Sequence, residues 1–218
     1  MAARAEGAPK SFMEYIMQLY YAPGACSLAS HIALEESGLP YQVVRVSLRD
    51  KKTSDGVDFN TINPKGYVPA LKLDNGEVLT EGGALLAYIG ELQPSRGLIP
   101  AAGTLENYRV REWLVFIGSE LHKNAGPLFS PKTPEATRAT QIEALKRRLT
   151  YVSEALAKRP FLTGEKFTVA DAYLYTVLSW MGHLGIELAE WPALKAYYER
   201  IGTRPAVQAA LKAEAQPN

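Results

Sequence analysis

The chain has 218 residues but only one cysteine, Cys26, and three histidines. A single cysteine excludes an internal disulfide and a metal site built from several thiolates, and it is typical of proteins from a reducing, cytoplasmic setting. His31 and His183 belong to no ligand pattern, so the sequence predicts no metal site. A run of about 18 apolar residues is also missing, which excludes a membrane-spanning helix of ordinary length.

The sequence also lacks an excess of charge of one sign, because its 24 Lys and Arg residues are balanced by 23 Asp and Glu residues. A general nucleic-acid binder would carry a marked basic excess, so that class is excluded. The composition, 47% apolar and 22% charged, is typical of a folded globular protein of one large or two small domains. Residues 1–16 contain no apolar stretch long enough for a signal peptide and are interpreted as an extension.

Residues 17–92 alternate strand-like and helix-like segments. Asp74-Asn75-Gly76 is a strong hairpin signal, whereas the first two strands flank a helix and are expected to be parallel. The predicted order is therefore βαβ followed by ββα, in residues 17–21, 27–37, 41–46, 68–73, 77–79 and 81–92. This order predicts a mixed four-stranded sheet with helices on both faces, the arrangement of a thioredoxin-like domain over residues 17–96.

The segment after a linker at residues 97–103 is predicted to be helical throughout. Apolar residues recur three and four positions apart within residues 134–158, which gives that helix a single apolar face. Thr168 and Asp171 have the spacing of a capping box that opens the next helix. The sequence thus predicts an all-helical domain over residues 104–218.

Cys26 is the first candidate functional residue. It follows a strand and a Pro-Gly turn and opens a helix, where unpaired N–H groups and the helix dipole favour a thiolate. The alternative is a small buried hydrophobic residue, which free cysteine often is. No second cysteine stands at the CxxC spacing, so dithiol oxidoreductase chemistry lacks its resolving partner.

Val68-Pro69 and Glu81-Gly82 are the other candidates. A cis bond at Pro69 would turn the backbone N–H and C=O of Val68 toward Cys26, where an extended peptide can pair with them; a trans proline at a sheet edge is the commoner alternative. Backbone amides at the start of the helix after Glu81 can hold a carboxylate, and Glu81 itself can pair with an ammonium or simply match the helix dipole. Together these residues predict a pocket for a short zwitterionic peptide with a sulfur at its centre.

The chain resembles the bacterial beta-class glutathione S-transferases over residues 17–212. The resemblance rests on LYYAPGACSLASHI at residues 19–32, NPKGYVPAL at 63–71, LTEG at 79–82 and FTVADA at 167–172, in that order. It implies a glutathione-binding thioredoxin-like domain followed by a helical domain with a pocket for the electrophile. It also implies a cytoplasmic homodimer that acts in detoxification by conjugating the glutathione thiolate to small hydrophobic electrophiles.

The resemblance further implies roles for individual residues. Cys26 and His122 match catalytic positions beside the glutathione sulfur, and Trp180 matches an aromatic residue that lines the electrophile pocket. Val115 stands where the family often has an asparagine that reaches toward glutathione, so one polar contact of about 1 kcal/mol is expected to be missing. Besides Cys26 and His122, the glutathione-binding positions it implies are Lys51, Val68, Pro69, Glu81, Gly82, Ser119 and Lys123.

Two alternatives stay open on the sequence. One is a glutathione-dependent thiol transferase or peroxidase that uses Cys26 as the nucleophile through a mixed disulfide. The other is a non-catalytic protein of the same fold that carries hydrophobic ligands, and Val115 is the feature that favours it. The sequence does not identify the electrophile, since pocket shape depends on packing.

Overall fold

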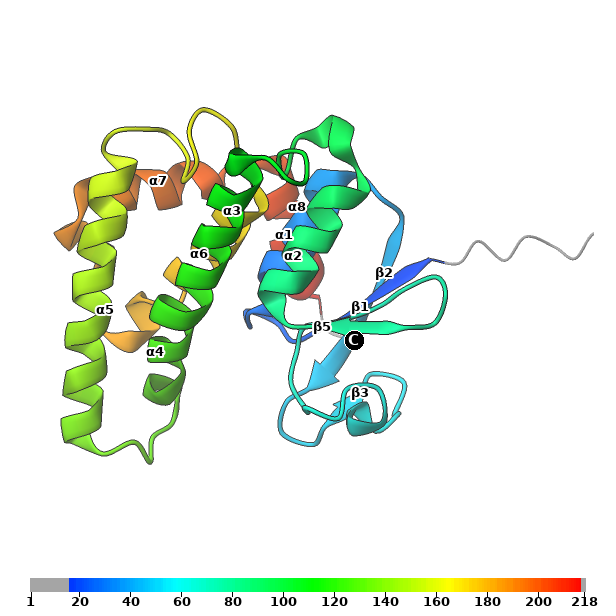
Figure 1. Ribbon diagram of the computed structural model, residues 1–218. Helices are drawn as coiled ribbons and strands as arrows, with labels where there is room; N and C mark the ends of the chain where they lie inside the picture. Colours follow the sequence, from blue (N-terminus) through cyan, green and yellow to red (C-terminus); the bar gives the residue numbers. More distant parts are fainter. Residues whose placement is uncertain (1–15, 217–218) are drawn as a thin grey trace, which may run out of the picture.

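The computed structural model describes residues 16–216 as a small sheet covered by helices, followed by an all-helical part (Figure 1). The extension predicted for residues 1–16 lies outside the described residues except for Ile16. Within residues 16–216, no helix is long and apolar enough to cross a membrane.

The sheet is mixed and has the strand order β3-β2-β1-β4-β5. β1 pairs in parallel with β2 and antiparallel with β4, and β4 continues antiparallel into β5 through the predicted hairpin. The strands are β1 (Met17–Tyr21), β2 (Tyr41–Ser47), β3 (Lys52–Thr53), β4 (Ala70–Lys72) and β5 (Val78–Thr80). The βαβ and ββα order is confirmed, but the sheet has five strands rather than four. The additional strand, β3, is two residues long and forms by pairing with the end of β2.

The two faces of the sheet are covered differently. Leu19 and Tyr21 on β1 point into the core formed with helices α1 (Ser27–Ser37) and α2 (Gly82–Leu92). Tyr20 points to the opposite face, where it packs against Phe59 in the short 3-10 helix η1 (Phe59–Thr61). The prediction of helices on both faces is therefore wrong in part. Both α-helices lie on one face, and the other face is covered by a polar loop with a single helical turn.

The remainder of the described chain is helical, as predicted. Its first long helix is not regular: α3 (Leu105–Phe116) continues as a π-helical segment, η3 (Ile117–His122), before α4 (Lys123–Ala125). Thr168 and Asp171 form the predicted capping box ahead of α6. The other α-helices are α5 (Glu135–Leu156), α6 (Val169–Leu178), α7 (Pro192–Gly202) and α8 (Pro205–Glu214), and the other 3-10 helices are η2 (Pro94–Arg96), η4 (Gly126–Phe129), η5 (Gly182–Leu184) and η6 (Leu188–Glu190).

One apolar core runs through both parts of the molecule. Buried residues of α1 and α2 belong to the same cluster as those of α3, α5 and α6. In the segment predicted as a linker, Leu98 and Ile99 are buried, and the carbonyl of Leu98 accepts a hydrogen bond from the backbone N–H of Val169. Helices α1, α6 and α8 lie in contact, so the end of the chain returns to the first helix.

Candidate functional site

Cys26 lies at the junction of β1 and α1. β1 ends at Tyr21, a turn follows through Pro23 and Gly24, and Cys26 is the cap residue at the amino end of α1. Its sulfur donates a hydrogen bond to the carbonyl oxygen of Val68, with 3.1 Å between Sγ and O. The predictions that Cys26 opens a helix and that Val68 faces it are confirmed.

The protonation state of Cys26 differs from the expectation. Burial raises the pKa of its thiol to about 11, and the carboxylate of Glu81 acts in the same direction. Backbone N–H groups of Cys26 and Ser27 bond to the sulfur and lower the pKa, as expected at a helix start, but their effect is smaller. The shift is therefore opposite in direction to the one that the helix start predicts, and the bond to Val68 uses the proton of the thiol.

The peptide bond between Val68 and Pro69 is cis, as one of the two interpretations of the sequence required. Val68 lies outside the β4 ladder, and no partner for its backbone N–H is present in the part of the chain that the structure describes. Its carbonyl, also expected to be open, is instead the acceptor for the Cys26 thiol. The backbone N–H of Val68 is thus available to pair with a bound peptide, whereas its carbonyl already accepts the bond from the Cys26 sulfur.

A short loop fixes Val68 in this position. The side chain of Asn63 is buried and donates from Nδ2 to the carbonyl of Tyr67 at 2.7 Å, while the N–H of Gly66 donates to the carbonyl of Asn63 at 2.8 Å. Lys51 closes the loop from outside, because its Nζ donates to the carbonyl of Gly66 at 2.7 Å. The backbone ahead of the cis bond is therefore held by polar contacts at several points.

Glu81 forms the second polar corner of the site. It precedes α2 with a positive φ of 73°, and its carboxylate accepts hydrogen bonds from Lys65 Nζ at 2.6 Å and from the Tyr67 hydroxyl at 3.3 Å. The bond from Lys65 is the main reason that the pKa of Glu81 is lowered, so this carboxylate is ionised at neutral pH. Gly82 follows as the first residue of α2, where free N–H groups of the helix start can hold an anion.

The opposite wall comes from the irregular end of the first long helix. Val115, Ser119, His122 and Lys123 all face the site from α3, η3 and α4. Gly118 lies between them, and a Cβ at that position would stand 3.6 Å from the Tyr173 hydroxyl. This is an ordinary van der Waals distance, so η3 packs directly on Tyr173 of α6, and His122 lies beside the same tyrosine.

His122 and Tyr173 form a hydrogen-bonded pair. His122 Nδ1 lies 2.8 Å from the Tyr173 hydroxyl. Burial lowers the pKa of His122 and raises that of Tyr173, so both are neutral at pH 7. Which of the two groups donates depends on the imidazole tautomer: with the imidazole proton on Nε2, the Tyr173 hydroxyl donates to Nδ1 and Nε2 is a donor.

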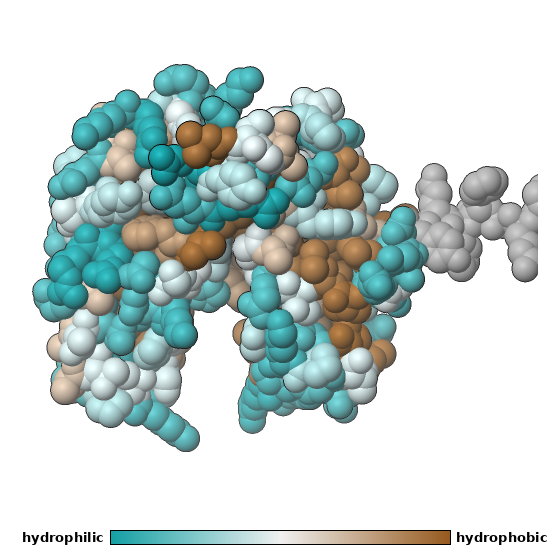
Figure 2. Space-filling view, in the orientation of Figure 1, coloured by the Kyte–Doolittle hydropathy of each residue, from teal (hydrophilic) through white to brown (hydrophobic). Residues whose placement is uncertain are grey.

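These two walls enclose a cavity of about 520 Å³, and the space-filling view is hollowed between the sheet and the helical part (Figure 2). The cavity joins a thiol, an open backbone N–H, an ionised carboxylate with a helix start, and a neutral histidine. No group of His, Cys, Asp or Glu side chains within residues 16–216 is arranged to hold a metal ion. The predicted site residues that line the cavity are Cys26, Val68, Pro69, Glu81, Gly82, Ser119, His122 and Lys123.

Lys51 and Trp180 were predicted at the site but do not line this cavity. Lys51 bonds to the carbonyl of Gly66 from behind the Val68 loop. Trp180 is 6% exposed, and its indole packs behind His122 with 5.0 Å between ring centroids. Its Nε1 donates to the carbonyl of Gly24, so the ring is buried by two contacts that the linear sequence does not reveal.

Sequence reasoning also missed residues that belong to the cavity. Tyr173 and Tyr67 line it, and Lys65 pairs with Glu81 at its edge. Lys65 and Tyr67 lie inside the NPKGYVPAL motif at residues 63–71. Their place in that motif was the one signal in the sequence that pointed to them. Tyr173 stands two positions after Asp171, and no spacing relates it to His122, which is 51 residues away.

Comparison with known proteins shows which family the chain resembles. Residues 24–92 match the family model of the glutathione S-transferase N-terminal domain, and residues 116–205 match that of the C-terminal domain. Glutathione S-transferase GstA of Escherichia coli O157:H7 is 46% identical over 198 residues, which covers 91% of this chain and 98% of that protein.

Solved structures agree as well. A beta-class glutathione S-transferase of Sphingomonas chungbukensis matches with a TM-score of 0.88 and 46% identity, over 91% of this chain and 98% of that one. A sphingomonad glutathione S-transferase in complex with glutathione matches with a TM-score of 0.89 and 49% identity, over 92% and 100% of the two chains. Because both family models match and these relatives span nine-tenths of the chain, it belongs to the glutathione S-transferase family, in its bacterial beta class.

Proposed function

We propose that the cavity between Val68, Glu81 and His122 binds glutathione, and that the chain conjugates the glutathione thiolate to small hydrophobic electrophiles. The observation that carries this proposal is the combination, in one cavity, of an open backbone N–H, an ionised carboxylate at a helix start and a neutral imidazole. The sphingomonad relative in complex with glutathione supports the same conclusion.

The peptide part of glutathione fits the polar side of the cavity. The N–H of Val68 pairs with the cysteinyl backbone as an added strand would, and Pro69 keeps that edge of the backbone open. The γ-glutamyl carboxylate binds the N–H groups at the start of α2, and its ammonium pairs with Glu81. Ser119 and Lys123 contribute polar contacts from the opposite wall, while Lys51 reaches the glycine carboxylate only by leaving Gly66.

The sulfur then lies between Cys26 and His122. The thiol of glutathione loses its proton to solvent, and the N–H of His122 Nε2 stabilises the thiolate by a charge-assisted hydrogen bond. The thiolate attacks an electrophilic carbon, the S–C bond forms, and the leaving group departs with its electron pair. Cys26 remains a thiol in this scheme and is not the nucleophile, because burial raises its pKa to about 11.

The electrophile fits the apolar side of the cavity, which Leu114 and the ring of Tyr173 provide. Trp180, expected at that place, supports the wall from behind through His122. We propose further that the chain acts in the cytoplasm as a homodimer, in detoxification, as the family resemblance implies. The exposed Leu105, Tyr108 and Val115 on α3 are apolar surface that a second copy could cover.

The direct test is a conjugation assay with the purified protein, glutathione and 1-chloro-2,4-dinitrobenzene, an activated aryl halide. We expect steady formation of the dinitrophenyl conjugate and retention of the protein on immobilised glutathione. Absence of both, with binding of apolar dyes retained, would instead support the non-catalytic carrier.

The thiol transferase alternative and the proposed conjugation differ in the role of Cys26, so a variant at this residue distinguishes them. A Cys26→Ala variant is expected to keep most of its conjugating activity, because the variant leaves His122, Val68 and Glu81 in place. Reduction of a glutathione mixed disulfide should be lost in the same variant, since no other cysteine exists in the chain. Loss of both activities would make Cys26 the obligate nucleophile and would contradict the proposed scheme.

A further inference from the structure

The peptide of Gly24, two residues ahead of Cys26, is held on both sides by side chains of the helical part of the chain. Its N–H donates to Glu214 Oε2 at 2.9 Å, and its carbonyl accepts from Trp180 Nε1 at 2.9 Å. Gly24 has a φ of +67°, a conformation that side chains rarely adopt, so the turn depends on this residue. A single residue, Ala25, separates this doubly bonded peptide from Cys26.

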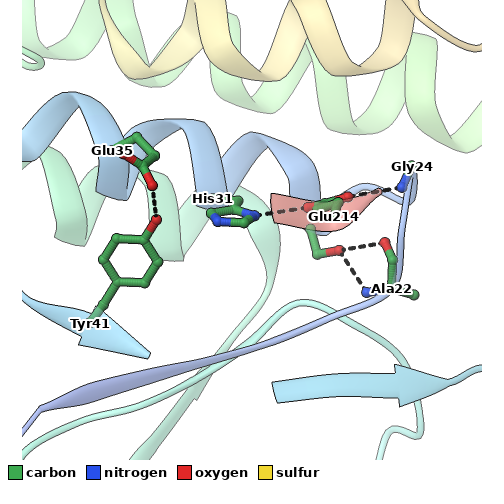
Figure 3. A network of polar contacts seen from close by, with 7 residues as sticks. Ala22, Gly24, His31, Glu35, Tyr41 and Glu214 are labelled. Atoms are coloured by element: carbon green, nitrogen blue, oxygen red, sulfur yellow. Dashed lines mark hydrogen bonds and ion pairs between the residues drawn. The ribbon is translucent and has the colours of Figure 1, made fainter. Parts of the chain in front are cut away.

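Glu214 is a buried carboxylate at the end of α8. Figure 3 shows it between His31 on α1 and the backbone of Gly24, with 3.0 Å between His31 Nδ1 and Oε1. Its side chain is 4% exposed and that of His31 is 1% exposed. A buried polar contact of this kind is weak support for stability, since well-packed apolar residues often serve as well. What apolar residues could not supply is an acceptor for the N–H of Gly24.

Trp180 links the same turn to the other wall of the cavity. Its indole N–H donates to Gly24, while its ring lies against His122. The turn itself is tied to α1 by Ser27, whose hydroxyl bonds to both the N–H and the carbonyl of Ala22. Rotation of the Gly24 peptide would therefore move Cys26 relative to both Val68 and His122.

We propose that Trp180 and Glu214 are positioning residues, which hold the Gly24 peptide so that the start of α1 keeps Cys26 opposite Val68 and His122. Neither residue lines the cavity, and both act through the backbone of the turn. The effect on catalysis rests on the proposed function and acts through His122, against which the ring of Trp180 packs, because a displacement of about 1 Å near a reacting group can cost about a hundredfold in rate.

The first experiment compares Trp180→Phe with Trp191→Phe. Trp191 is also a buried tryptophan whose Nε1 donates one hydrogen bond, to Thr150 at 2.9 Å, but it does not touch the turn. In Trp180→Phe we expect kcat for aryl halide conjugation to fall about tenfold with KM for glutathione within about twofold, the effect of one lost hydrogen bond. Trp191→Phe should keep both constants.

The second experiment uses the alkylation rate of Cys26 to report on the conformation of the turn at Gly24, and it needs no substrate. Iodoacetamide alkylates the only cysteine, and without glutathione added we expect its rate at pH 8 to rise about fivefold or more in Trp180→Phe. The reason is that a loosened turn takes the sulfur away from Val68 and out of its buried position, which lowers its pKa. Glu214→Leu, which removes the acceptor for the N–H of Gly24, should act in the same direction, whereas Glu36→Leu, which removes the bond of α1 to Arg204, should not.

The double variant Trp180→Phe/Glu214→Leu completes the test. Because both side chains hold one peptide group, their effects on the alkylation rate should be less than additive in free energy. Additive effects, or alkylation of either single variant at the rate of its control, would overturn the inference. These readouts need no transferase activity, so a wild-type protein that fails to conjugate would refute the proposed function and leave the positioning test intact.

Discussion

At Cys26, two effects of opposite sign act on the charge of one sulfur atom. The start of a helix favours a thiolate, and this is what the sequence position indicates. Burial favours the thiol, and it is the larger effect here, since the pKa is raised to about 11. The sequence shows which residue starts the helix but not how much water the folded chain leaves around it, so only the structure decides between the two.

This balance predicts how Cys26 reacts with pH. With a pKa of about 11, the thiolate fraction at pH 8 is about a hundredfold smaller than that of an ordinary thiol of pKa near 9. Alkylation by iodoacetamide should therefore be slow at pH 8 and still rise above pH 9, whereas the urea-unfolded chain should react as a free thiol. Because the folded pKa is raised, the thiol stabilises the fold below about pH 9, and this contribution is lost as pH rises through about 11. A rate that levels off at or below pH 7 would contradict the assignment.

Val115 offers a second prediction at the scale of one side chain. It lines the cavity and is 68% exposed, so a polar side chain there meets no packing conflict. Val115→Asn should restore one hydrogen bond to glutathione, worth about 1 kcal/mol, and lower KM for glutathione about fivefold. Val115→Leu is the matched control and should leave KM unchanged. An unaltered KM in the asparagine variant would show that this position does not face bound glutathione.

The site residues that could be predicted from the sequence are those that a local pattern, such as a turn or a helix start, identifies. Cys26, Val68 and Glu81 each stand at the start of an element, and the structure brings all three to one cavity. Trp180 and Tyr173 illustrate the opposite case, because their orientation depends on how α6 packs against distant segments. The family resemblance therefore indicated Trp180 near the site, but it did not show that the ring lies behind His122 rather than in the cavity.

At the scale of elements, turn chemistry predicted most of the boundaries. The Pro-Gly turn, Gly38 and the Asn75-Gly76 hairpin separate segments whose ends agree with the observed strands and helices to within a few residues. The two irregular elements were not predictable in this way. β3 is two residues long and is defined by its pairing with β2 and a bridge from Lys52 to Asp58, and the π-helical turn at residues 117–122 has no pattern of spacing or turn residues that marks it.

The capping box of α6 carries a prediction about stability. Asp171 is buried and accepts hydrogen bonds from the N–H of Thr168 at 2.8 Å, the N–H of Leu162 at 2.9 Å and the Tyr197 hydroxyl at 2.9 Å. Asp171→Ala leaves these buried donors without an acceptor and should lower the free energy of unfolding by about 3 kcal/mol. Urea unfolding measures this directly.

The matched control for Asp171 is Glu106→Ala. Glu106 is also an acidic residue in the first turn of a helix, but it is exposed and belongs to no capping box. Its removal should change the unfolding free energy by about 0.5 kcal/mol or less. If the two variants unfolded at the same urea concentration, the hydrogen bonds of Asp171 would have no special weight in the fold.

At the scale of the whole molecule, the site depends on both parts of the chain. One wall of the cavity comes from the sheet and α2, the other from α3, η3 and α4, and a shared core joins them (Figure 1). The predicted division at residues 96 and 104 describes the order of elements along the sequence. It does not show that the last helix, α8, returns to the turn beside Cys26, since that contact joins residues 190 positions apart.

The oligomeric state is a prediction at this scale. The exposed apolar residues on α3 and the family resemblance favour a homodimer, so light scattering after gel filtration should give twice the mass of one chain. We expect this mass to persist at micromolar concentration and in high salt, because apolar contacts are not screened by ions. A single-chain mass under these conditions would contradict the dimer while leaving the cavity of each chain unchanged.

The central claim is that the cavity binds glutathione and ionises its thiol, and the absorbance of the thiolate near 240 nm tests it most directly. In the Cys26→Ala variant the only thiol present is that of glutathione, so the signal has one source. The account predicts that bound glutathione titrates about one pH unit or more below the value of about 8.5 for a free thiol, the effect of one charge-assisted hydrogen bond. Titration at the value of free glutathione, with glutathione at saturating concentration, would contradict it.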